Sequence, residues 1–120
     1  MFELNFFIGS GNVVGELKRK EGENGKPNIT SFDVAIKYKE IDEKGQNYRV
    51  VTYGTVADEA IKTLSENDRV LIRGKIQQKK FQPKSGSEVT FWQIVASSVD
   101  LMSKGVAGRI KPDIDDDYDF

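Results

Sequence analysis

Apolar and polar residues alternate along most of the first hundred positions, which is the pattern of half-buried β-strands. The first strand is expected in two apolar pieces, Leu4–Ile8 and Val13–Lys20. Because Gly9 and Gly11 lie between them, we expect one long strand bent at these glycines, as a closing barrel requires. Polar loops follow at 21–28, 39–46 and 82–88. Four further strands are expected, at Ile29–Tyr38, Tyr48–Tyr53, Arg69–Phe81 and Val89–Leu101.

One segment departs from this alternation. Between Thr55 and Asn67, apolar residues at positions 56, 57, 60, 61 and 64 form a single helical stripe. Thr55 followed by Asp58 resembles a capping box at the start of this helix. The chain is therefore predicted to be all-β with one short helix between strands 3 and 4. This order matches the OB-fold, a five-stranded Greek-key barrel, whereas a small barrel of the SH3 type would lack a helix there.

Composition excludes several kinds of chemistry. The 120 residues include no Cys and no His, so disulfides, thiol chemistry, the usual zinc sites and His-based acid–base catalysis are not available. Asp42 and Glu43 lie in a polar loop, where a solvated charge run is the simpler interpretation. We therefore expect neither an enzyme nor a cofactor or metal site. No segment resembles a signal peptide or a membrane span, so a cytoplasmic protein without a membrane partner is expected.

Charge divides the chain into a basic body and an acidic end. Residues 1–112 contain eighteen Lys and Arg against fourteen Asp and Glu, a formal charge of +4, whereas the last eight residues contain five Asp and no cation. We expect a barrel domain at 1–102, a short linker at 103–112 and an acidic tail at 113–120. This asymmetry is typical of a chain with a polyanionic partner or an interaction tail.

Single-stranded nucleic acids require cations for the phosphates and flat aromatic surfaces for the exposed bases. On the strand 69–81, alternation turns Val70, Ile72 and Ile76 inward and leaves four cations and Phe81 outward. Trp92 has the parity of Ile94, which leaves it open whether Trp92 lines a groove, the core or a subunit interface. The candidate nucleic-acid-binding residues are Lys18, Lys20, Lys37, Tyr38, Lys39, Tyr48, Arg49, Tyr53, Arg73, Lys75, Lys79, Phe81 and Trp92.

From Leu4 to Met102 the chain resembles, in order, the bacterial and phage single-stranded DNA-binding (SSB) proteins. NFFIGSGNVVGEL resembles the family's first strand with its early glycine, and FDVAI lies where the family has its second strand. YRVVTYG resembles the stretch Arg-Val-Val-x-Phe-Gly, and VLIRGKIQQKKF resembles a strand that ends in Trp. The end DIDDDYDF resembles the family's acidic tip, which closes with Pro-Phe.

The resemblance implies stacking aromatics on strands 2, 3 and 4, and two of them match Tyr53 and Phe81. Two family tryptophans are replaced, because Asn47 and Glu40 occupy their positions. Weaker binding per nucleotide is therefore expected, since each base–aromatic stack contributes about 1–3 kcal/mol. The divergence, the small size and the short linker favour a phage or plasmid member, in a bacterial cell or a phage-infected host.

The resemblance further implies binding of single-stranded DNA (ssDNA) during replication, recombination or repair, and a homo-oligomer, either tetramer or dimer. The alternative function is an OB-fold adaptor for protein interactions, such as replication restart, with weak nucleic-acid binding. The tail is expected to recruit replication and recombination proteins, although Asp119 stands in place of the family proline. The residues expected to bind these partners are Asp113, Asp115, Asp116, Asp117, Tyr118, Asp119 and Phe120.

Overall fold

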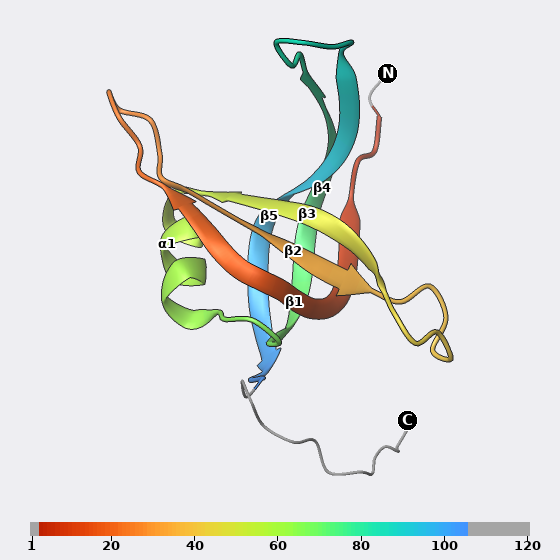
Figure 1. The fold of residues 1–120 in the computed structure, drawn as a ribbon. Helices are drawn as coiled ribbons and strands as arrows, with labels where there is room; N and C mark the ends of the chain where they lie inside the picture. Colours follow the sequence, from red (N-terminus) through yellow and green to blue (C-terminus); the bar gives the residue numbers. More distant parts are fainter. Residues whose placement is uncertain (1–2, 106–120) are drawn as a thin grey trace.

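Five strands and one helix, in the order predicted from the sequence, close into a barrel (Figure 1). The computed structural model describes residues 3–105. Around the barrel the strands follow the order β1-β2-β3-β5-β4, with β3 and β5 parallel and all other neighbours antiparallel. The OB-fold prediction is confirmed. The elements are β1 (Phe7–Lys20), β2 (Ile29–Ile36), β3 (Gln46–Tyr53), α1 (Gly54–Thr63), β4 (Arg69–Phe81) and β5 (Val89–Ser103).

Strand β1 closes the barrel because it pairs with two neighbours in succession. Its first half pairs with β4 up to Asn12, and from Asn12 onward it pairs with β2. Gly11 lies at this change of partner, where a Cβ atom would collide with the backbone oxygen of Ala35. Gly15, whose φ is +76°, lies in an irregularity of the β1–β2 register that the alternation did not predict. Glycine thus allows both the close approach and the irregular backbone.

The inward side chains of all five strands form one apolar core. Val13, Val34, Val50, Val70 and Ile72 are fully buried. The helix α1 covers one end of this core with the buried residues of its predicted apolar stripe. Two hydrogen bonds at this end also join the helix to β2 and β2 to β3. Thr30 Oγ1 donates to the backbone oxygen of Ala57 over 2.9 Å, and Thr52 Oγ1 donates to that of Thr30 over 2.7 Å.

The predicted capping box at the start of α1 is wrong. The helix begins at Gly54, whose φ is +65° and whose backbone N–H donates to the oxygen of Asn28, and no side chain caps it. The Asp58 carboxylate instead accepts hydrogen bonds from Asn28 and from Arg19, which lower its pKa below the ordinary value. Asp58 therefore ties the helix to β1 and the β1–β2 loop.

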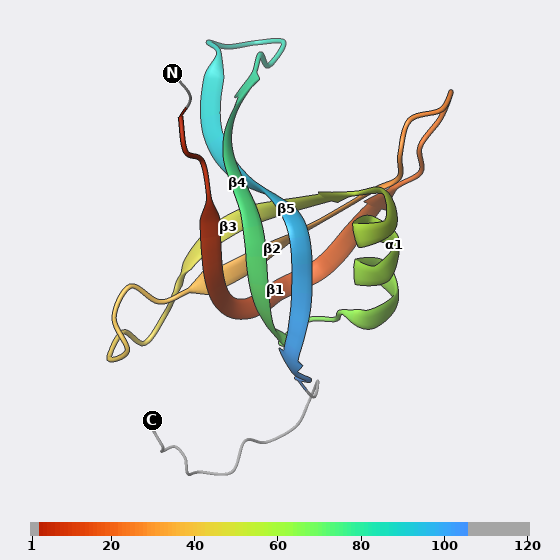
Figure 2. The same ribbon diagram turned by 180° about the vertical axis from the view of Figure 1, so that it is seen from behind.

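One side chain that was predicted to point inward lies outside the core. Ile76 pairs with Ile94 on the core side of its strand, but it is 42% exposed because β4 and β5 continue past the barrel as a two-stranded ribbon. Figures 1 and 2 show this ribbon projecting from the barrel, and we call its paired residues 75–81 and 89–95 the β4–β5 ribbon. Strand β2 ends at Ile36, two residues before the predicted end at Tyr38, and Tyr38 is 81% exposed.

A buried carboxylate fixes the end of β5. The side chain of Asp68 is fully buried and accepts hydrogen bonds from the backbone N–H groups of Ser65 and Gly105, at 2.9 and 2.8 Å, and from Lys104 Nζ at 2.9 Å. Burial alone would raise the pKa of this carboxyl. The three donors outweigh burial and hold the pKa of Asp68 below its ordinary value. No helix within residues 3–105 is long and apolar enough to span a bilayer.

Candidate nucleic-acid interface

The pairing register assigns each candidate residue of β3 to one side of the sheet. Val50 is buried in the core, so Arg49 and Tyr53, which have the opposite parity, point outward. Tyr48 has the opposite parity, pairs with the buried Val34 and lies on the core side. Neighbours in the sequence therefore contribute to different surfaces.

The outward row of β3 continues onto the β4–β5 ribbon. Arg49 pairs with Gln93 of β5, and Gln93 pairs in turn with Gln77 of β4. On the same side of the ribbon, Lys79 lies opposite Phe91. The other pairs on this side are Lys75 with Val95 and Phe81 with Val89.

The same surface continues across β2 to the end of β1. Lys18 pairs with Ser31, which pairs with Val51, and in the next row Lys20 pairs with Ile29, which pairs with Tyr53. Cations and aromatic rings from four strands thus share one side of the barrel. We call this surface the outer face and define it by Lys18, Lys20, Arg49, Tyr53, Lys75, Lys79, Phe81 and Phe91.

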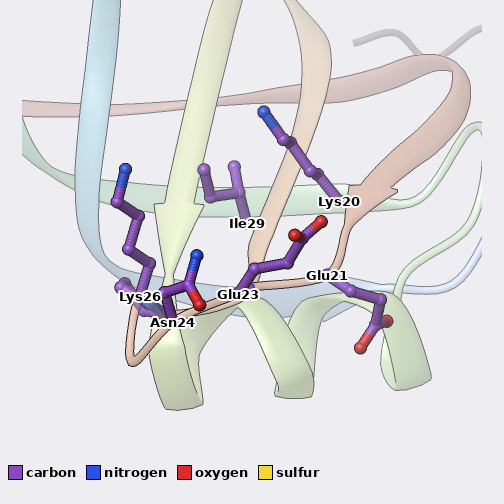
Figure 3. A pocket seen from close by; sticks show the side chains of 8 residues that line it. Lys20, Glu21, Glu23, Asn24, Lys26 and Ile29 are labelled. Atoms are coloured by element: carbon purple, nitrogen blue, oxygen red, sulfur yellow. The ribbon is translucent and has the colours of Figure 1, made fainter.

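A cleft in the β1–β2 loop adjoins the outer face beside Ile29. It has a volume of about 390 Å³. Figure 3 shows Lys20, Lys26 and Glu23 pointing to one side around Ile29, while Glu21 points away from them. Glu21 is engaged with Arg19, whose Nε lies 2.6 Å from the Glu21 carboxylate. Lys26 is a cation that the sequence interpretation passed over, although its place in a loop next to β2 was the available signal.

The charges on the outer face differ in how far they are neutralised. Arg49 Nε donates to Asp33 Oδ1 over 2.9 Å, and both side chains are about half exposed. Within residues 3–105, no carboxylate forms an ion pair with Lys18, Lys20, Lys75 or Lys79. A phosphate that binds Arg49 must displace the Asp33 carboxylate, whereas at these four lysines it displaces no carboxylate of the described residues.

The structure separates Tyr48 and Trp92 from the outer face. Both line a hollow of about 340 Å³ on the core side of the ribbon, with walls that are almost entirely apolar. Trp92 is 64% exposed there and lies opposite Gln78 on the strand pair. We call this site the apolar hollow, and its lining residues are Phe7, Tyr48, Ile76, Trp92, Gln93 and Ile94.

The remaining candidates lie at the margins. Lys37, Tyr38 and Lys39 follow β2 in an exposed loop, where Lys37 shares a shallow hollow with Arg69. Arg73 pairs with Ser98 and with Ile8 of β1, and its guanidinium lies 3.7 Å from the Asp100 carboxylate. The residues expected to bind protein partners, Asp113 to Phe120, lie outside the described residues.

Phe91 and Asp33 are the members of this region that the sequence interpretation did not select. Alternation showed that Phe91 and Trp92 face opposite ways, but it did not show which of them faces the core. The pairing of Val50 with Ile94 decides this, because both are buried. Within residues 3–105, no group of three or more His, Cys, Asp or Glu side chains is placed to hold a metal ion.

A five-stranded OB barrel with a basic, aromatic outer face belongs to the class of small oligonucleotide-binding domains. Residues 4–102 match the Single-strand binding protein family, and the chain belongs to this family. Among solved structures it is similar to a Plasmodium falciparum SSB complex with ssDNA. The TM-score is 0.70 at 20% sequence identity, and the match covers 86% of this chain and 98% of that chain. No curated protein sequence matches significantly. As a member of this family, the chain is a binding protein and not an enzyme.

Proposed function

We propose that this protein binds single-stranded DNA along the outer face, without strong sequence preference. The observation that carries the proposal is the continuity of that face, on which lysines alternate with Tyr53, Phe81 and Phe91 across four strands. Within residues 3–105 these lysines form no ion pair. Bases stack on the rings and phosphates meet the ammonium groups. Because every base has a flat π-face, such a surface tolerates any sequence.

The proposal is tested by titrating a fluorescein-labelled 20-mer of dT and following its anisotropy over a salt series. Four lysine–phosphate contacts on a single strand give a log–log salt slope of about −3. A duplex of the same length should bind more weakly, because paired bases cannot stack on the rings. Equal affinity for both, or no binding of dT at low salt, would contradict the proposal.

A double variant tests the face itself. Lys79→Ala with Phe81→Ala should weaken dT binding strongly, since it removes one phosphate contact and one stacking ring. The matched control is Lys62→Ala with Ile41→Ala, which removes a cation and an exposed apolar side chain away from the outer face. If the first variant keeps its DNA affinity, the alternative function, an adaptor for protein interactions, is favoured instead.

We infer further that the protein protects ssDNA intermediates in replication, recombination or repair, in a phage or plasmid context. The acidic tail is proposed to recruit replication proteins through Phe120 and the neighbouring aspartates, a role supported by the charge division of the sequence. Phe120→Ala should leave dT affinity unchanged and abolish binding to the replication proteins of the host. A variant that still binds them would remove this part of the proposal.

Self-association is proposed from the apolar surfaces around the first half of β1. Phe7 lines the apolar hollow, and Leu4, Phe6 and Ile8 are exposed on the same stretch of the chain. Within residues 3–105, the stretch from Phe7 to Gly9 has β4 as its only strand partner, so its other edge is available to a second copy. We therefore propose a homo-oligomer, a dimer or a tetramer.

Light scattering tests this assembly. Phe6→Glu with Ile8→Glu should lower the mass to that of one chain, because two charges cannot be buried unpaired in an apolar contact. Ile41→Glu, at a more exposed apolar residue in the β2–β3 loop, is the control and should leave the mass unchanged. A wild-type mass equal to one chain at micromolar concentration would overturn the proposal.

A further inference from the structure

Phe91 is an aromatic residue of the outer face at a position that the family resemblance did not single out. It is 39% exposed and lies directly opposite Lys79 in the antiparallel pairing of β4 and β5. Its sequence neighbours Thr90 and Trp92 point to the other side of the ribbon. Phe91 thus presents a ring beside a lysine that has no ion pair within the described part of the chain.

The surroundings of Phe91 hold its strand firmly while leaving the ring accessible. Two residues along β5, Gln93 is buried, and its Nε2 donates to Gln77 Oε1 over 2.9 Å. The same Gln93 pairs with Arg49, which joins the ribbon to β3. The parallel pairing of β3 and β5 begins at Arg49 and Gln93. Two residues before this pair, β5 has Phe91 and β3 has Asn47, which has no ring. Phe91 therefore supplies the ring on the outer face just before this pair.

The register also places Phe91 next to Phe81. Phe81 lies opposite Val89, so Phe91 is its diagonal neighbour on the same side of the ribbon. Diagonal neighbours of this kind are about 7–8 Å apart at their backbones, within reach of aromatic side chains. The two rings thus provide adjacent flat surfaces, with Lys79 directly across the strand pair from Phe91.

We propose that Phe91 is a base-stacking residue that works together with Phe81. One base of a single strand stacks on Phe91 while the neighbouring base stacks on Phe81, and Lys79 contacts the phosphate between them. Phe91 thereby restores, from β5, the aromatic surface that β3 lacks at Asn47. This inference rests on the proposed function, since it names the site at which a part of the strand is bound.

The test compares Phe91→Ala with the wild-type chain on a dT 20-mer. Loss of one stacked base predicts binding about 5- to 150-fold weaker. Phe91→Tyr retains a ring and should bind within about twofold of wild type. Thr90→Ala, one residue away on the other side of the ribbon, is the control and should bind as wild type does. Circular dichroism and light scattering on every variant verify that fold and mass are unchanged.

A second probe separates stacking from general weakening. On an abasic oligomer of the same length, which offers phosphates without bases, Phe91→Ala and wild type should bind equally, whereas Lys79→Ala should weaken binding to both oligomers. A wild-type chain that does not bind dT would overturn the proposed function itself. If wild type binds and Phe81→Ala weakens binding while Phe91→Ala does not, the proposed function stands and this inference is wrong.

Discussion

Two adjacent residues of β3 illustrate how strongly one position along a strand decides function. Tyr48 and Arg49 are both suited to nucleic acid, yet Tyr48 lines the apolar hollow and Arg49 lies on the outer face. Alternation along this strand places Arg49 and Tyr53 on one face and Tyr48 on the other. It did not predict the partner of Arg49, because Asp33 lies sixteen residues earlier and meets Arg49 only through the β2–β3 register.

Asp33 is expected to restrain DNA binding, because it neutralises the Arg49 guanidinium on the outer face. Asp33→Asn should therefore tighten dT binding severalfold at low salt. The salt slope should steepen by about 0.7, the contribution of one more phosphate contact on a single strand. Anisotropy titrations over a salt series measure both quantities.

The control for this variant is Glu59→Gln on α1, which changes the net charge equally but lies exposed away from the outer face. Glu59→Gln should change the dT affinity by less than half as much as Asp33→Asn does. The reason is that exposed charges act only over roughly the Debye length, about 10 Å at 0.1 M salt. Equal effects of both variants would show that only net charge matters.

At the scale of elements, the sequence predicted β4 to the residue, but not where the barrel ends along it. The alternation of β4 continues unchanged through Ile76, so nothing in the strand itself marks the boundary. The boundary arises from the partners, because β3 pairs with β5 only at Arg49–Val51. The β4–β5 ribbon beyond this point is the part of the candidate site that needed the three-dimensional structure.

The β1–β2 loop is expected to extend the binding surface. Lys20→Ala with Lys26→Ala should weaken dT binding and reduce the magnitude of the salt slope by about 1.4, because two phosphate contacts are lost. The matched pair Lys44→Ala with Lys62→Ala removes two exposed lysines that are not part of the outer face, one from the β2–β3 loop and one from α1. If both pairs reduce the slope equally, the loop has no particular place in the interface.

The turn between α1 and β4 is held by Asp68, and its stability should depend on pH. The lowered pKa means that the charged form stabilises the fold above the ordinary carboxyl pKa of about 3.9, and that this stabilisation is lost as pH falls through the folded value. Asp68→Asn should cost about 1–3 kcal/mol at pH 7, since it replaces hydrogen bonds to a buried charge.

Thermal unfolding from pH 7 to pH 3 measures this contribution. The difference in stability between wild type and Asp68→Asn should be constant down to about pH 5 and should shrink below pH 4. Asp100→Asn, at an exposed carboxylate of β5, should change stability little at any pH. A difference for Asp68→Asn that persists unchanged at pH 3 would contradict the assignment.

At the scale of the whole molecule, the division of charge can be predicted by counting charged residues along the sequence. We expect it to let the acidic tail compete with DNA for the basic domain. A run of aspartates attached to a basic domain acts at high effective concentration against phosphates. Deleting Asp113–Phe120 raises the formal charge from −1 to +4 and should tighten dT binding, most strongly at low salt. Replacing the five aspartates with asparagine should have the same effect, and unchanged affinity at low salt would exclude this competition.

The position of the single tryptophan has a practical consequence. Trp92 lies in the apolar hollow, on the side of the ribbon away from the outer face, and the sequence contains no other tryptophan. Its intrinsic fluorescence should therefore respond when subunits associate and remain nearly constant when dT is added to an assembled protein. Emission at the tryptophan wavelength and anisotropy of a labelled oligonucleotide would then report two separate events in one cuvette. Assembly and DNA occupancy become distinguishable without attaching a dye to the protein.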